Sequence, residues 1–438
     1  MRRHVLATAV LGWLVSGCMM DTAAEGSGSS GGGAGGGSSD GQVDPGTLTA
    51  ADWDDNANFT FYQRYVAQFL EGNSAWPAAA TDRVTVNIVD ERGRPVPSAQ
   101  VTVSNNTGAS FSSRTSAQGR ALLFPSRDLG GGGSFVVKAE LQDGSVAPVT
   151  VTMATETDAW DVVLPSASVQ RPGALDLAFM VDTTGSMGDE IEFLAREIQG
   201  ISDAIRAQLP EVNVRYALVV YRDGPAGNAA AADNPLARVV GEVLGGMNAP
   251  MAEEYLVRTF DFTDSLDDFK SKVDAQEAGG GGDYPEAVEA GLEAMNGLSW
   301  RSGNVARLAF FIADAPPHHD RAQRTMDEIQ RARLAGITVF PVAASGSSVH
   351  SEYVMRVAAQ VTQGRFIFIT DDSGVGGSHE EPSIPCYRVQ KLQGIIIRNV
   401  VSEVSGARVE PGSEDILREV GNPVEGVCTL EDGSEAYL

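Results

Sequence analysis

Three oxygen-bearing side chains follow a short apolar stretch near the middle of the chain. Asp182, Thr184 and Ser186 stand two residues apart, directly after the apolar run Leu175–Val181. That run is too short for a core helix and has the length of a buried strand. A carboxylate and two hydroxyls on a tight turn after a strand offer hard oxygen ligands to a cation such as Mg2+. In open α/β sheets, ligands bind at the carboxyl ends of the strands.

The turn Asp182–Ser186 resembles the Asp-x-Ser-x-Ser motif of von Willebrand factor type A domains, with Thr184 in place of the first Ser. In that family the motif is the core of a metal-ion-dependent adhesion site. The domain binds a partner and is not an enzyme. The resemblance therefore implies a Rossmann-like domain, here residues 172–405, that carries a divalent cation.

Two later segments resemble the remaining parts of such a site. A run of four glycines precedes Asp283-Tyr284-Pro285-Glu286, which is similar to the Asp-x-Pro-Glu of integrin β A-like domains and of hemicentin-like domains. Many A domains have a ligating Thr here, which this chain lacks. By the integrin β resemblance, Glu286 is the fourth ligand, and Asp314, after the strand pattern Arg307–Ala313, is the fifth. The alternatives are that Glu286 only favours a helix N-terminus and that Asp314 only caps a helix.

Acidic residues also follow the first motif. Integrin β domains carry two acids at the positions of Asp189 and Glu190, where they hold an adjacent Ca2+; the resemblance implies such a site here, with Asp283 as a further contributor. The alternative is that both acids simply favour the first turn of a helix. A zinc site at His318 and His319 is disfavoured because adjacent His side chains rarely face one metal and no spaced His or Cys supports them.

The resemblance implies a mechanism of adhesion. The protein would supply most of the ligands of Mg2+ (or Mn2+) and leave one position to water, which an Asp or Glu carboxylate of a protein or matrix partner displaces. The alternative is a structural envelope protein whose metal site only stabilises the fold. Asp223, in a loop after a strand pattern, is interpreted as part of a turn; the alternative is that it also lines the upper edge of the site.

Enzymatic alternatives lack essential residues. A phosphatase of the haloacid dehalogenase type needs Asp-x-Asp, and Thr184 at the second position leaves no proton donor. Nucleotide-binding motifs need Gly-x-Gly-x-x-Gly or a Gly-Lys-Ser/Thr loop, which neither Thr183–Gly188 nor Gly279–Gly282 contains. Ser186 is not in a Gly-x-Ser-x-Gly elbow.

Strand and helix patterns alternate through residues 172–405, which predicts parallel βαβ units. The strand patterns are Leu175–Val181, Val212–Val220, Tyr255–Asp261, Arg307–Ala313, Ile337–Ala343 and Arg365–Ile369. The helical patterns are Glu190–Leu209, Leu266–Gln276, Pro285–Leu298, Arg321–Ala335, Ser351–Thr362 and Val389–Val404. The second and third strands have no clear helix between them, so we expect them to pair antiparallel.

Residues 82–165 contain short strand patterns separated by turn residues, which predicts a small β-sandwich. The strands are expected at Val84–Val89, Gln100–Val103, Ala121–Phe124, Ser134–Leu141, Val149–Ala154 and Asp161–Leu164. The turn Asp90–Val96 and the segment Ala117–Arg120 resemble carboxypeptidase regulatory-like domains. Residues 51–81 are predicted to be a short helical segment, with a helix near Phe59–Leu70. The whole chain is therefore predicted to be multidomain.

The N-terminal residues indicate export. Residues 1–17 read as a signal peptide, and Val15-Ser16-Gly17-Cys18 resembles a bacterial lipobox, which implies lipidation of Cys18. The alternative is an ordinary signal peptide. Met19 is not Asp, which favours the outer membrane. Residues 18–50 are Gly/Ser-rich and are predicted to be a flexible tether, and no later stretch is apolar for long enough to span a bilayer.

Composition limits the remaining choices. The 438 residues allow two or three domains, and a net charge of -26 opposes binding to nucleic acid, whose phosphates would be repelled. In an exported protein, Cys386 and Cys428 are expected to form a disulfide. That disulfide would hold the acidic C-terminal tail, residues 406–438, to the segment before the last helix. Together these features predict a lipid-anchored protein of the bacterial cell envelope.

Overall fold

The computed structural model describes residues 48–131, 133–141, 144–154, 157–165, 167, 171–223, 255–280, 284–373, 382–430 and 432–438. All of them lie within the unit Val43–Leu438. The predicted signal peptide, Cys18, the tether up to residue 47 and Asp283 lie outside the described residues. Among the described helices, none is both long enough and apolar enough to cross a bilayer.

The described residues form a nine-stranded sheet in the order β11-β10-β9-β12-β13-β14-β1-β15-β16. Its strands are β1 (Thr49–Trp53), β9 (Ala174–Asp182), β10 (Asn213–Tyr221), β11 (Val257–Thr263), β12 (Ala306–Ala313), β13 (Thr338–Ala343), β14 (Phe366–Thr370), β15 (Tyr387–Lys391) and β16 (Arg418–Val420). Neighbours from β10 to β14 are parallel, and the outer strands pair antiparallel. Every residue of β12 and β13 is buried, as expected for central strands covered on both faces.

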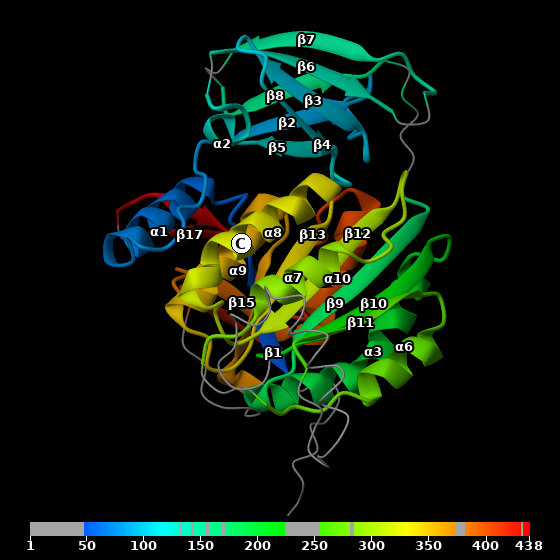
Figure 1. Ribbon diagram of the computed structural model, residues 1–438, viewed down its shortest axis with the longest axis vertical. Coiled ribbons are helices and arrows are strands. Elements are labelled where there is room, and N and C mark those ends of the chain that lie inside the picture. Colours follow the sequence, from blue (N-terminus) through cyan, green and yellow to red (C-terminus); the bar gives the residue numbers. More distant parts are fainter. Residues whose placement is uncertain are drawn as a thin grey trace, which may run out of the picture. The chain divides into compact units, whose positions relative to one another are not determined.

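Helices cover both faces of this sheet (Figure 1). One face carries α3 (Gly188–Gln208), α6 (Leu266–Asp274) and α10 (Leu392–Ser405), and the other carries α7 (Val288–Asn296), α8 (Ala322–Ala335) and α9 (Val349–Thr362). Alternate side chains of β9 divide between the two layers because successive strand residues point to opposite faces. Leu177, Phe179 and Val181 pack with α3 and its neighbours, whereas Ala178 and Met180 pack with α7 to α9. The molecule is thus a mixed α/β protein with a largely parallel centre, compatible with a Rossmann-like domain.

Most predicted elements of this region lie within a few residues of the observed ones, and β10 and β11 do pair antiparallel. The helix predicted at Val389–Val404 is wrong at its beginning. Val389 lies in β15, and α10 begins only at Leu392. The apolar residues on either side of that boundary fit a buried strand as well as a helix, so periodicity alone did not separate them.

Strand β1 was not predicted from the sequence. Thr49–Trp53 begins within the range assigned to the tether, yet all five of its residues are buried between β14 and β15. Alanine and aspartate are poor strand formers, so local propensity gives no signal here. The strand is stabilised from elsewhere: Asp52 pairs with Arg365 at 3.0 Å and with Arg398 at 2.7 Å. The helix predicted after it is present as α1 (Phe59–Gly72).

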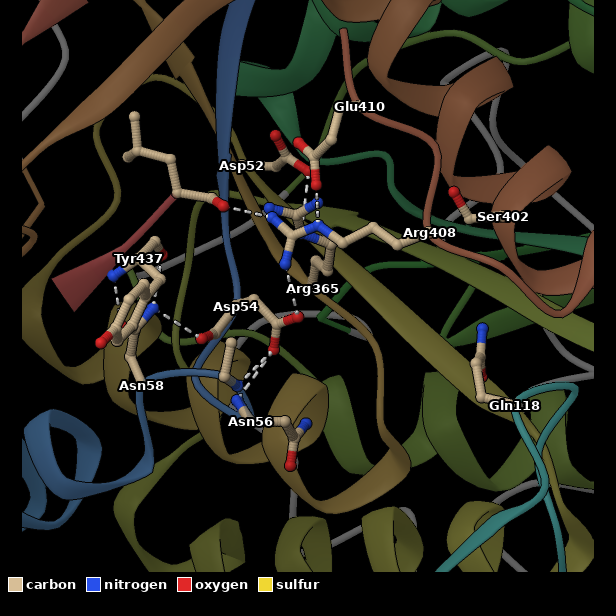
Figure 2. A network of polar contacts seen from close by, with 12 residues as sticks. Asp52, Asp54, Asn56, Asn58, Gln118, Arg365, Ser402, Arg408, Glu410 and Tyr437 are labelled. Atoms are coloured by element: carbon tan, nitrogen blue, oxygen red, sulfur yellow. Dashed lines mark hydrogen bonds and ion pairs between the residues drawn. The ribbon is translucent and has the colours of Figure 1, made fainter. Parts of the chain in front are cut away.

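Residues of the C-terminal tail contact the segment between β1 and α1 (Figure 2). The Asn58 amide donates to the Tyr437 carbonyl at 2.7 Å and accepts from the Tyr437 N–H at 2.7 Å. Arg408 pairs with Asp54 and donates to the carbonyl of Leu438. The tail also forms a hairpin of β17 (Val427–Thr429) and β18 (Glu435–Tyr437). It is therefore more ordered than its loose sequence pattern indicated.

A disulfide joins Cys386 to Cys428, with a Cα–Cα distance of 6.5 Å. Both cysteines are buried and form an apolar cluster with Trp53 and Ala436. The bond thus links the hairpin to the beginning of β15 and covers the last residue of β1.

The region predicted as a β-sandwich contains two small sheets, ordered β5-β2-β8 and β4-β3-β6-β7. Their strands are β2 (Val84–Val89), β3 (Gln100–Asn105), β4 (Ser110–Arg114), β5 (Arg120–Leu123), β6 (Ser134–Glu140), β7 (Val149–Ala154) and β8 (Ala159–Val163), with α2 (Pro125–Leu129) after β5. Buried residues from both sheets belong to one apolar cluster. Strand β4 was not predicted, because only one of its five residues is apolar.

Candidate metal site

Two of the predicted ligands, Asp182 and Asp314, stand at the ends of neighbouring parallel strands, at one edge of the nine-stranded sheet. Asp182 is the last residue of β9 and lies opposite Tyr221, the last residue of β10. On the other side, Val181 lies opposite Ile312 of β12, so that Asp314 follows β12 beside the end of β9. Parallel neighbours bring their carboxyl ends together, which is why residues more than a hundred positions apart meet here.

The turn after β9 closes on Asp182. Oδ1 of Asp182 accepts hydrogen bonds from the N–H and from the hydroxyl of Thr184, both at 2.8 Å. Oδ2 is buried and has no hydrogen-bond partner. Burial and, next, the carboxylate of Asp314 raise the pKa of Asp182 to about 7, although the bonds from Thr184 act in the opposite direction. The Asp182 carboxylate therefore has one buried oxygen that no hydrogen-bond donor satisfies.

Asp314 faces the same space. Its side chain accepts a hydrogen bond from Ser186, while Oδ1 is buried without a partner. Burial raises the pKa of this carboxyl group. Its backbone carbonyl accepts from the hydroxyls of Tyr284 and Ser351, both at 3.0 Å, which holds the loop in place.

Glu286 is positioned by the backbone on both sides of it. Its N–H donates to the carbonyl of Pro316 at 2.9 Å, and its Oε2 accepts from the N–H of Asp223 at 2.7 Å. Helix α7 begins only at Val288, so the Glu286 side chain extends towards the end of β10 rather than capping the helix. Burial and, next, the charge of Asp182 raise the pKa of Glu286 to about 9.

These residues fit a hard divalent cation by chemistry. All five donors, Asp182, Thr184, Ser186, Glu286 and Asp314, are oxygens, the preferred ligands of Mg2+. Two of the three carboxylates keep a buried oxygen without a donor, and a buried carboxylate that lacks a positive partner costs several kcal/mol, on the order of a buried ion's desolvation.

The side chains are not arranged around a central position. Among the residues that the structure describes, no three His, Cys, Asp or Glu side chains form a ready metal-binding group. Hydrogen bonds show why: the hydroxyls of Thr184 and Ser186 donate to Asp182 and Asp314, and Glu286 accepts from Asp223. Oδ1 of Asp182 and Oε2 of Glu286 are thus engaged within the protein, whereas Oδ2 of Asp182 and Oδ1 of Asp314 have no hydrogen-bond partner.

The two acids predicted for an adjacent site differ in how deeply their side chains are buried. Glu190 is 5% exposed, and its Oε2 is buried with no hydrogen-bond partner. Burial, and then the charges of Asp189 and Asp314, raise the pKa of Glu190 to about 7. Asp189 is more exposed. The charge of Asp314 thus acts on the Glu190 carboxyl group. The third predicted contributor, Asp283, is outside the described residues.

Asp223 is a site residue that the sequence interpretation treated as an ordinary turn. Its N–H donates to Glu286, and its Oδ2 lies 2.8 Å from Nε2 of His318. The loop after β10 is thereby joined to the loop after β12. A signal was present in the sequence: like Asp182 and Asp314, Asp223 lies within two residues of the end of an apolar strand at this edge. His318, weighed above as a zinc ligand, pairs with this carboxylate instead.

Comparisons with known proteins give only partial matches. No family profile matches the sequence. An α-protein kinase, vwkA from Dictyostelium discoideum, is 26% identical over 158 residues, which cover 36% of this chain and 21% of that protein. A putative ariadne-like RING finger protein of Acanthamoeba polyphaga mimivirus is 28% identical over 151 residues, covering 34% and 12%. The chain thus spans about a fifth and about an eighth of the lengths of these two curated relatives.

Among solved structures, the conserved hypothetical protein BatB from Bacteroides thetaiotaomicron has a TM-score of 0.33 and 11% identity, covering 53% of this chain and 98% of BatB. The proximal thread matrix protein 1 of the mussel byssus also has a TM-score of 0.33, with 14% identity, and covers 55% of this chain and 54% of that protein. Scores this low do not assign a fold. The mixed α/β architecture therefore rests on this chain's own strand order.

Proposed function

We propose that residues 172–405 are a von Willebrand factor type A domain that binds a divalent cation and, through it, a partner. The observation that carries the proposal is the meeting of Asp182, Glu286 and Asp314 at one sheet edge, where Asp182 and Asp314 each keep a buried oxygen without a donor. Three distant segments of the chain contribute to it, in the order that the motifs predicted. Mg2+ or Mn2+ suits this all-oxygen set.

Each residue has a distinct part in this proposal. Asp182, Glu286 and Asp314 hold the negative charge that retains the cation, and Thr184 and Ser186 contribute neutral oxygens. The cation supplies an electrophilic position that a carboxylate of the partner can occupy. Gly185 and Ser186 are exposed while the three carboxylates are buried, so a partner would approach over this turn.

The remaining expectations of the sequence belong to the same proposal. Glu190 and Asp189 would hold an adjacent Ca2+. The two small sheets would form a carboxypeptidase regulatory-like β-sandwich. Lipidated Cys18 and the Gly/Ser-rich tether would anchor the protein in the bacterial cell envelope, with a protein or matrix polymer as partner and no catalytic activity.

A second function follows from the same buried carboxylates. The unpartnered oxygens of Asp182 and Asp314 destabilise the fold when no cation is present, so the cation could serve stability alone. The two functions differ in what chelation does. Adhesion predicts that a partner is released while the fold persists, whereas the structural function predicts that the fold melts and no partner depends on the metal.

The test is Mg2+ titration calorimetry on residues 43–438, which form one unit, beside Asp182→Ala and Glu286→Ala. Asp327→Ala is the matched control, because that carboxylate is on α8 with its side chain 60% exposed. We expect binding by the wild type and the control and none by the two site variants. Binding that survives in Glu286→Ala would remove that residue from the ligand set. Absence of binding by the wild type would end the proposal.

The partner is sought by capture on the immobilised protein with Mg2+ and with EDTA, with Asp182→Ala on a parallel column. A partner that elutes with EDTA and is absent from the Asp182→Ala column supports adhesion. A partner retained on both columns would bind elsewhere on the protein.

A further inference from the structure

We infer that Arg222 is a positioning residue that holds the ligand-bearing turn Asp182–Ser186 to the segment that leads into the glycine run. The inference rests on the proposed function and adds to it a residue that contacts none of the five ligand side chains in any observed bond. Arg222 follows β10 directly and is 5% exposed. Its hydrogen bonds reach two of the loops that form the site.

The first bond joins Arg222 to the Asp182–Ser186 turn. Nε of Arg222 donates to Oγ1 of Thr183 at 3.1 Å. The same hydroxyl donates to the Tyr221 carbonyl at 3.1 Å and lies 2.6 Å from the hydroxyl of Tyr255. Thr183 stands between the predicted ligands Asp182 and Thr184, so a fixed Thr183 restricts the backbone on which both are carried.

The second bond joins Arg222 to the segment that leads into the glycine run. Its guanidinium donates to the carbonyl of Glu277. Next to that point, the N–H of Gly279 donates to the carbonyl of Thr183 at 3.0 Å. Gly280 has φ of +79°, and a Cβ placed there would lie 3.5 Å from Cδ of Arg222, so this loop runs alongside the arginine side chain. The turn and the glycine loop are thus held to one side chain and to each other.

The guanidinium is itself held in one orientation. Its central carbon lies 4.5 Å from the ring centroid of Tyr255. The backbone of the same residue is held as well, because the backbone N–H of Arg222 donates to the Leu256 carbonyl at 3.0 Å. A planar group with donors on separate nitrogens can bond two acceptors in different directions while stacking on a ring. A lysine ammonium keeps the charge but not this geometry.

The position of Arg222 also sets that of its neighbour. Asp223 donates its N–H to Glu286 and pairs with His318. The two consecutive residues therefore contact the turn after β9, the glycine loop, Glu286 and the loop after β12. Outer contacts that orient metal ligands commonly change metal affinity about 10- to 100-fold when they are removed.

Two variants separate geometry from charge. Arg222→Lys retains a cation, and Arg222→Met retains the length of the side chain without charge. Arg215 supplies the matched controls, Arg215→Lys and Arg215→Met, because it lies on β10, the strand that Arg222 follows. It pairs with buried Asp176 at 2.9 Å and lies over the Phe262 ring at 4.8 Å, but near the opposite end of that strand.

We measure Mg2+ affinity by calorimetry and, on the metal-free proteins, amide hydrogen exchange in peptides covering residues 182–186 and 277–280. Both Arg222 variants are expected to bind Mg2+ about tenfold more weakly and to exchange faster in those two peptides. The Arg215 variants should keep the wild-type affinity and exchange there, whatever their melting temperatures.

Wild-type affinity in Arg222→Lys would show that charge alone matters and would overturn the positioning role. Equal losses of affinity in the Arg222 and Arg215 variants would overturn it too, since the effect would be general destabilisation. If the wild type binds no Mg2+, the proposed function fails; the exchange data then decide separately whether Arg222 holds the two loops, and unchanged exchange would refute that as well.

Discussion

Arg356 of α9 and Asp55 form an ion pair with hydrogen bonds of 2.7 and 2.9 Å, and neither side chain has any exposure to solvent. The guanidinium carbon also lies 3.7 Å from the ring centroid of Tyr65, and Glu352 accepts a third bond at 3.0 Å. Asp55 belongs to the segment between β1 and α1, 301 residues earlier in the chain. The N-terminal segment is therefore attached to the α/β fold by a buried polar contact as well as by the strand β1.

Breaking this pair should destabilise the protein strongly. Arg356→Met leaves the Asp55 carboxylate buried without its partner, which costs about 3–5 kcal/mol of the free energy of unfolding. The double variant Asp55→Leu with Arg356→Met should recover part of that loss, because no unpaired Asp55 charge remains. Urea unfolding measures both. Arg331→Met, which removes a half-exposed arginine of α8, is the control and should change little; an equal loss there would contradict the prediction.

Asp52 predicts a dependence of stability on pH. Burial raises the pKa of Asp52, but Arg365 and Arg398 outweigh it and lower the pKa to about 2. A lowered folded-state pKa stabilises the protein above the unfolded value of 3.8, and this contribution is lost as pH falls towards 2. Asp52→Asn should therefore be less stable than wild type by about 2 kcal/mol at pH 7, with the difference shrinking below pH 4. A difference that stays constant from pH 7 to pH 2.5 in urea unfolding would contradict this assignment.

Loss of the disulfide should lower the stability of the protein and leave its Mg2+ affinity unchanged. It closes a loop between residues 42 positions apart, which corresponds to about 4 kcal/mol in the chain-entropy estimate. Replacing Cys386 and Cys428 by Ala, or reducing them, should lower the melting temperature of residues 43–438. Mg2+ affinity should remain at the wild-type value, because β15 lies five strands from β9 in the sheet order. Weaker Mg2+ binding in the reduced protein would show that the two regions are coupled.

Replacing Asp182 should raise the stability of the metal-free protein and abolish its response to Mg2+. Its Oδ2 is buried without a donor, so Asp182→Asn removes an uncompensated charge and should raise the stability of the metal-free protein by about 1–3 kcal/mol. The same change removes a predicted ligand, so Mg2+ should no longer raise the melting temperature. Thermal unfolding with Mg2+ and with EDTA tests both parts. Asp327→Asn, an exposed change on α8, should leave the response to Mg2+ intact. A metal-free Asp182→Asn that melts below wild type would mean that the hydrogen bonds from Thr184 to the carboxylate outweigh the cost of its buried charge.

The alternating strands and helices of residues 172–405 and the antiparallel pairing of β10 with β11 were predictable from the sequence alone. These features depend on local information: apolar runs such as Leu175–Val181 and the lack of a clear helical pattern in the sequence after Val220. The candidate ligands Asp182, Glu286 and Asp314 were also named from local motifs. Asp182 and Asp314 meet at one edge because they follow neighbouring parallel strands, whereas Glu286 reaches this edge from the segment before α7.

Other features depend on contacts between residues that are far apart in the chain. Thr49–Trp53 is a strand because β14, β15 and the arginines that hold Asp52 surround it, and none of these neighbours can be read from the five residues themselves. The parts of Arg222 and Asp223 depend equally on what lies opposite them, such as Thr183 and the Glu286 carboxylate. Local propensity reports the conformations that a segment favours alone, whereas burial, hydrogen bonds and charge pairs depend on partners that long-range folding brings to it.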